Sequence, residues 1–149
     1  MAQSKLAHEL NSLIKLDVDA MHAYLQAIQH VEYTPIREKL GEFLEDHERH
    51  AVRLAELVSA MGEESTEFSR DFKGFFLEGF TSLMSVTGMR MALEAMKMNE
   101  KLTNRKYKEA LDGDLPPNIR MVVGEHYGDE RRHLDYIEQV LADHPWERQ

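Results

Sequence analysis

The residues best suited to bind metals occur twice in this sequence, at one fixed spacing. The first set comprises Asp17, Tyr24, His47 and His50, and the second, 83 residues later in each case, comprises Glu100, Tyr107, Glu130 and His133. Flanking apolar residues keep the same register, as the match of Leu10 with Leu93 illustrates. Carboxylate oxygens and imidazole nitrogens are ligands for first-row divalent metals. The repeat therefore predicts two related halves that build one kind of site.

Composition narrows the chemistry of such a site. The chain has 149 residues, which is the size of one domain with its own core. It contains no cysteine, so histidine and carboxylate remain as the strong metal ligands. The net charge of −9 argues against nucleic-acid binding, because phosphate contacts require clustered Lys and Arg. No signal-peptide pattern or membrane span is found, and we expect a cytoplasmic protein without nucleic-acid or membrane partners.

Four segments of the chain have the pattern of helices that pack lengthwise. Each carries apolar residues at spacings of three and four, with polar residues of the two sets at its middle. Thr34 and Pro35 form a start signal for the second segment, and Gly62 forms its stop signal. Gly113 and the two prolines Pro116 and Pro117 separate the third segment from the fourth.

These signals predict an all-α fold, a four-helix bundle of two duplicated antiparallel helical hairpins in a single domain, residues 1–149. The hairpins cover about residues 4–61 and 86–142, and a long crossover covers 62–85. Five of the six phenylalanines lie in this crossover, namely Phe68, Phe72, Phe75, Phe76 and Phe80. We interpret the crossover as a segment with a short helix that packs along the bundle. The alternatives are a dimer patch, and hence a homodimer, or a membrane-facing surface.

The hairpin turns bring the polar residues of all four helices to one height, because each helix rises about 1.5 Å per residue. Three carboxylates and three imidazoles then meet in an apolar core, where each unpaired ion costs several kcal/mol. The total stability of a domain is only about 5–15 kcal/mol, so the charges must be compensated. Bound metal ions would do this. A metal-free network of carboxylate–imidazolium pairs is the alternative.

The fourth segment contains Gly128-Asp-Glu-Arg-Arg-His133, in which Glu130 and His133 are three residues apart. This motif resembles the Glu-x-x-His signature of the ferritin-like di-iron carboxylate superfamily, and the bacterioferritin and rubrerythrin branches are the most similar. In that superfamily the first and third helices each supply one carboxylate, and Asp17 and Glu100 match these positions. The resemblance implies a ferritin-like bundle that binds two iron ions, with manganese or zinc as alternatives.

The resemblance also implies roles for single residues. One metal would be held by Asp17 with His50, the other by Glu100 with His133, and Glu130 would bridge them. Asp46 and Asp129 resemble aspartates that hydrogen-bond and orient the ligand histidines. The second helix departs from the pattern, because His47 replaces the bridging glutamate, and we expect His47 to bind one metal terminally. The site would then be an asymmetric di-iron centre, a di-metal centre with an added water or oxo bridge, or a site with a single occupied position. Haem is not expected, since Glu48 stands where bacterioferritin has its haem-binding methionine.

Five further histidines and two tyrosines of interest lie outside this set of six ligands. His126 lies one turn before Glu130 but matches Phe43 in the repeat, which favours a supporting or core role over metal binding. His8, His22, His30 and His144 lie off the apolar seams or near the chain ends, and we expect them at the surface. Tyr24 and Tyr107 are either core aromatics or hydrogen-bond donors and radical scavengers beside an oxidising metal, and are the candidate catalytic residues.

The sequence leaves two classes of function open. The first is a di-iron oxidoreductase that oxidises Fe(II) with oxygen or peroxide, as a ferroxidase or a peroxide scavenger. The second is a non-catalytic interaction module in which a metal or an ion-pair network holds the helices together.

Overall fold

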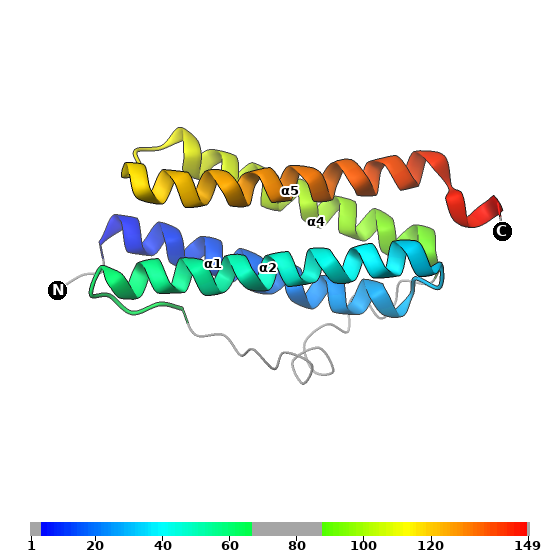
Figure 1. Cartoon of the computed structure of the whole chain (residues 1–149), viewed down its shortest axis with the longest axis horizontal. Helices are drawn as coiled ribbons and strands as arrows, with labels where there is room; N and C mark the ends of the chain where they lie inside the picture. Colours follow the sequence, from blue (N-terminus) through cyan, green and yellow to red (C-terminus); the bar gives the residue numbers. More distant parts are fainter. Residues whose placement is uncertain (1–3, 67–87, 149) are drawn as a thin grey trace.

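The computed structural model describes residues 4–66 and 88–148, and this part of the chain is dominated by four long helices. They are α1 (Lys5–Gln29), α2 (Thr34–Ala60), α4 (Met89–Asp112) and α5 (Pro117–Asp143), followed by the short 3-10 helix η2 (Pro145–Arg148). The described residues contain no strand. The prediction of an all-α four-helix bundle is confirmed, and Figure 1 shows the α1–α2 hairpin lying along the α4–α5 hairpin.

Local chemistry explains three of the helix ends. The Ser4 hydroxyl accepts a hydrogen bond from the backbone N–H of Ala7 and caps α1. Gly62, with a φ of +77°, follows the end of α2 in a left-handed conformation that glycine adopts without strain. The guanidinium of Arg120 donates hydrogen bonds to carbonyl oxygens at the end of α4. Thr34 is the first residue of α2 rather than its cap, and no side chain caps that helix.

The apolar core consists of two clusters with a polar layer between them. One cluster joins the end of α1 and start of α2 to the start of α4 and end of α5, and includes Leu40, Leu93 and Ile137. The other joins the opposite ends of the same helices, and includes Leu10 and Leu54. This arrangement makes neighbouring helices antiparallel. It also leaves the middle of the bundle to the polar residues of the repeat.

The end of α2 and the start of α4 lie at opposite ends of the bundle, because the start of α2 shares a cluster with the start of α4. These two helix ends are therefore separated by about the length of α2, about 40 Å for its 27 residues. The predicted short helix and the phenylalanines of the crossover lie outside the described residues. Within residues 4–66 and 88–148, no helix has the length and apolarity required to cross a bilayer.

Candidate metal centre

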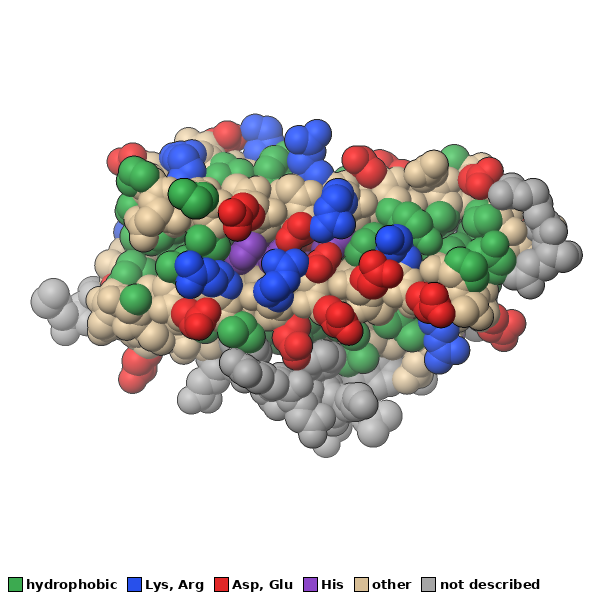
Figure 2. Space-filling view, in the orientation of Figure 1, with side chains coloured by type: hydrophobic (Ala, Val, Ile, Leu, Met, Phe, Trp, Pro, Cys, Tyr) green, Lys and Arg blue, Asp and Glu red, His purple; other side chains and the backbone are tan. Residues whose placement is uncertain are grey.

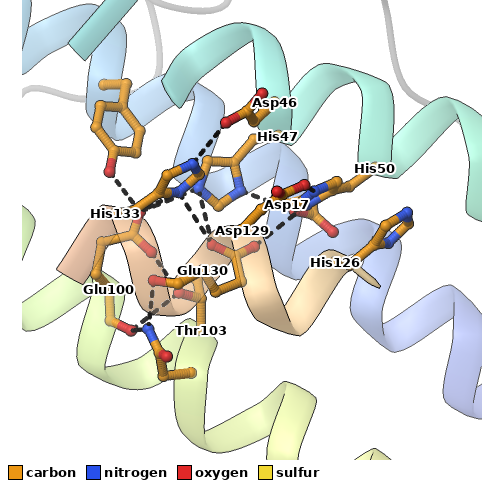
Figure 3. Close-up of polar contacts among 12 residues, drawn as sticks. Asp17, Asp46, His47, His50, Glu100, Thr103, His126, Asp129, Glu130 and His133 are labelled. Atoms are coloured by element: carbon orange, nitrogen blue, oxygen red, sulfur yellow. Dashed lines mark hydrogen bonds and ion pairs between the residues drawn. The ribbon is translucent and has the colours of Figure 1, made fainter. Parts of the chain in front are cut away.

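Six candidate ligands meet at the centre of the bundle. Each lies within three residues of the middle of its helix, and the set comprises Asp17 on α1, His47 and His50 on α2, Glu100 on α4, and Glu130 and His133 on α5. All six are completely buried. Figure 3 shows their side chains converging from all four helices. Their burial and convergence agree with the sequence-based expectation, while their role as ligands stays a prediction.

The six side chains form two overlapping groups of four. The first group contains Asp17, His47, His50 and Glu130, and the second contains His47, Glu100, Glu130 and His133. Within each group, one potential ligand atom per residue lies within 4.8 Å of all the others. His47 and Glu130 therefore belong to both groups. His47 was expected to bind one metal only, whereas its membership of both groups places it between two candidate positions.

Glu130 provides the test of whether a metal fits this site. Its carboxylate oxygens lie 3.3 Å from ring nitrogens of His47, His50 and His133. Neither oxygen accepts a hydrogen bond of good geometry from any described residue, although both are buried. A buried carboxylate without such a bond is costly, and a cation between it and the imidazoles would remove that cost. Nitrogen and oxygen donors together are a ligand set that first-row divalent metals accept, and each of the two groups could hold a metal ion.

The outer nitrogens of two histidines are held by aspartates from the opposite hairpin. His50 on α2 lies 2.8 Å through Nε2 from Asp129 of α5, and His133 on α5 lies 2.8 Å through Nε2 from Asp46 of α2. These two contacts use Nε2 and leave Nδ1 of each ring facing the inner carboxylates, Asp17 for His50 and Glu100 for His133. The orienting role that the resemblance implied for the two aspartates therefore has the required geometry, with each aspartate acting across the bundle.

Two arginines cover these aspartates at the surface, and neither was among the residues predicted from the sequence. Arg49 donates hydrogen bonds to Asp46 and Asp129, and Arg132 donates one to Asp129. Figure 2 shows histidine atoms at the floor of the seam between α2 and α5, bordered by arginine and acidic side chains. The 83-residue repeat could have revealed these arginines, because Arg132 is the repeat partner of Arg49.

The two tyrosines also act across the hairpins. The hydroxyl of Tyr24 donates a hydrogen bond to Glu100, and the hydroxyl of Tyr107 donates one to Asp17. Both tyrosines are fully buried. Thr103 adds a bond to the second oxygen of Glu100 at 2.8 Å, and the repeat position of Thr103 in the first half is an alanine. The two carboxylates are thus held by equivalent tyrosines but in unequal surroundings.

His126 supports the site without joining either group. Its ring stacks on that of His50, with centroids 4.0 Å apart, as the ring of Phe43 stacks on His133 at 4.1 Å. Phe43 and His126 are repeat partners, and each stacks on one of the site histidines. This equivalent stacking agrees with the expected supporting role of His126. Its Nδ1 also lies 3.4 Å from the hydroxyl of Tyr107. Burial and the charge of His50 lower the pKa of His126 to about 3.

The expectation that the other four histidines lie at the surface is wrong for His22. His8 is exposed, and His30 and His144 are partly exposed, but His22 is only 7% exposed. The physical reason is that α1 packs against both α2 and α4, so its buried face is wider than one seam. His22 does not belong to either ligand group.

The charged state of the ligands follows from their pairing. Burial alone would lower the pKa of His50 and His133, but hydrogen bonds to carboxylates raise these pKa values to about 10 and about 9. The pKa of His47 is also raised well above its ordinary value, because nearby glutamates outweigh burial. Burial raises the pKa of Asp17, but hydrogen bonds to histidines lower it to about 2. Without metal, the site at neutral pH is a set of ion pairs.

This pairing predicts how the metal-free protein responds to pH. Because the pKa values of His50 and His133 are raised in the folded protein, these histidines add to the free energy of unfolding. Their contribution is complete below about pH 6.5 and is lost as the pH rises through about 9 to 10. The lowered pKa of Asp17 gives stability that is lost as the pH falls from about 4 through about 2. We expect the chelator-treated protein to be most stable between about pH 4 and 6.5 in urea unfolding. Rising stability from pH 7 to 9 would contradict the pairing.

Asp46 and Asp129 give a second prediction, because each orients the histidine of a different group. Asp129→Asn should weaken metal binding in the first group, and Asp46→Asn in the second, by about 10–100-fold each. Competition with a coloured chelator would measure both affinities. Asp112→Asn is the matched control, since Asp112 is exposed and pairs only with Lys108 among the described residues. Equal affinities in all three variants and the wild type would refute the orienting role.

Comparison with known proteins identifies one family. Residues 5–113 match the family described as "Domain of unknown function (DUF2383)". The matched range contains α1, α2 and α4 and ends before α5, which carries Glu130 and His133. No curated protein and no solved structure matches the chain.

Proposed function

We propose that this chain, which belongs to the DUF2383 family, binds two first-row divalent metal ions at the centre of its bundle and uses them as an oxidoreductase. Iron is the proposed metal, with manganese or zinc as alternatives, and oxygen or peroxide is the proposed oxidant. The observation that carries the proposal is the pair of overlapping ligand groups that share Glu130 and His47. The resemblance to ferritin-like di-iron proteins supports the choice of iron.

The residues around the two groups have distinct tasks in this proposal. Asp17 and Glu100 each serve one ion, and the hydroxyls of Tyr107 and Tyr24 hold these carboxylates in place. Complete burial of the ligands excludes bulk water from them. Two bound Fe(II) ions would supply the two electrons that reduce one peroxide to water. Tyr24 and Tyr107 are then the nearest oxidisable side chains, which supports a role as radical scavengers.

The direct test is to measure metal content and turnover together. Protein purified without a metal-affinity step should contain close to two metal ions per chain by elemental analysis. After reloading with Fe(II), it should consume oxygen or peroxide while Fe(III) forms, as followed by absorbance and an oxygen electrode. Two bound ions without any consumption would reject the enzymatic part of the proposal. Protein that binds no first-row metal would reject the site itself.

A specific observation favours the second candidate, a non-catalytic bundle held by ion pairs. The formal charges at and around the site balance without any metal, with the two arginines at the surface and the other charged groups buried or partly buried. Five carboxylates, Asp17, Asp46, Glu100, Asp129 and Glu130, face three imidazoliums and two guanidiniums, those of His47, His50, His133, Arg49 and Arg132. In that case chelator treatment should change neither the helical content nor the melting temperature. A cytoplasmic location and a homodimer remain predictions from the sequence.

A further inference from the structure

His47 differs from the other two histidines of the site in the direction of its ring nitrogens. His50 and His133 each turn only Nδ1 inward, because Nε2 contacts an aspartate near the surface. His47 turns both nitrogens inward. Its Nδ1 lies 2.8 Å from Asp17 Oδ1, and its Nε2 lies 3.2 Å from Glu100 Oε2. Figure 3 shows the ring of His47 lying between these two carboxylates.

The two carboxylates that His47 contacts belong to different ligand groups. Asp17 occurs only in the first group and Glu100 only in the second. An imidazole ring that has lost both ring protons has one lone pair at each nitrogen, and these two lone pairs lie in the ring plane and point away from each other. We propose that His47 joins the two metal positions, with Nδ1 on the ion of the first group and Nε2 on the ion of the second. This inference rests on the proposed two-metal function and specifies its bridging residue.

Charge balance supports a ring bridge. The three inner carboxylates carry −3 together, whereas two divalent ions carry +4. When both nitrogens of His47 bind metal, its ring protons leave to the solvent and the ring carries −1, which brings the ligand charge to −4. Asp46 and Asp129 are balanced by Arg49 and Arg132 and add no net charge. A net charge at this site would be costly in free energy, because the inner ligands are completely buried.

A ring bridge has a structural consequence that distinguishes it from an oxygen bridge. Two metals joined through single carboxylate or water oxygens lie about 3.5–4 Å apart. Metals on opposite nitrogens of one imidazole lie farther apart, because the ring stands between them. Cu(II) is a suitable probe, since it binds imidazole strongly and carries one unpaired electron. Coupling of two Cu(II) spins through the ring removes the signal of isolated Cu(II) ions.

The experiment loads the full chain with two equivalents of Cu(II), checks the stoichiometry by elemental analysis, and records electron paramagnetic resonance and X-ray absorption spectra. We expect wild type to lose the isolated Cu(II) signal and to show no metal–metal distance of 3.5–4 Å. His47→Gln should restore the isolated signal or bind a single Cu(II), because an amide has no second ring nitrogen. His144→Gln, at the partly exposed end of α5, should match wild type.

Two results would overturn the ring bridge. One is a 3.5–4 Å metal–metal distance in wild type, and the other is coupling that persists in His47→Gln. Both leave the two-metal function intact. Wild-type protein that binds fewer than two ions at saturating Cu(II), Fe(II) and Zn(II) is a different failure, because it rejects the two-metal function on which the inference rests.

Discussion

Replacing Glu130 with alanine should remove the two-ion stoichiometry and most of the thermal stabilisation by metal. Glu130 belongs to both ligand groups, so its loss affects both positions at once. Metal at about 1,000 times its dissociation constant stabilises a protein by about 4 kcal/mol. For a chain of this size, that corresponds to a rise in melting temperature on the order of 10 °C. In Glu130→Ala the difference between metal-free and metal-loaded protein should fall close to zero.

The difference between the two forms is the quantity to compare, because Glu130→Ala also removes one carboxylate from three buried histidines of the metal-free protein. Burial raises the pKa of Glu130, and its oxygens accept no hydrogen bond of good geometry among the described residues. The carboxylate has ion pairs with three histidines but no well-directed hydrogen bond, and a bound metal would fill that gap. Glu130→Gln keeps the volume of the side chain and separates loss of a ligand from creation of a cavity. Glu138→Ala, an exposed change on the same helix, is the control. Unchanged metal content in Glu130→Ala would rule out a shared ligand.

Much of the site could be predicted because the repeat and the hairpins constrain the same residues. A spacing of 83 residues identified equivalent positions, and the turns determined their height along the helices. Asp17 and Glu100 consequently lie in the middle layer, as expected. The pairing of each tyrosine with the opposite hairpin could not be predicted, because it depends on which helices are neighbours and how far each is rotated about its axis.

The two positions that break the repeat show a further limit of sequence reasoning. His126 was recognised as the partner of Phe43, but its stacking on His50 requires ring positions that spacing does not specify. His47 was recognised as the partner of Glu130, and terminal binding followed from treating imidazole as a ligand with one nitrogen. The direction of both its nitrogens became visible only once Asp17 and Glu100 were placed on either side.

His47→Glu should accelerate the oxidation of Fe(II) by oxygen about tenfold or more, a change of about 1.4 kcal/mol in the activation barrier. One oxidant molecule must take electrons from both ions, and a carboxylate bridge holds two ions closer together than a ring does. The substitution also makes the two halves alike at this position, because residue 47 is the repeat partner of Glu130.

The variant must be compared in its metal-loaded form, because its metal-free form lacks a charge balance. Replacing an imidazolium with a carboxylate leaves the four inner carboxylates Asp17, Glu100, Glu130 and Glu at 47 with only two inner histidines, and each unbalanced buried charge costs several kcal/mol. The melting temperature of metal-free His47→Glu should therefore lie well below that of metal-free wild type. Binding of Fe(II) should remove this difference in melting temperature. His47→Gln, which adds no charge and no bridge, should not accelerate oxidation. If His47→Glu binds no metal, or if it binds two ions but oxidises Fe(II) no faster than wild type, then residue 47 does not lie between the metals and the site is not a variant of the di-iron centre.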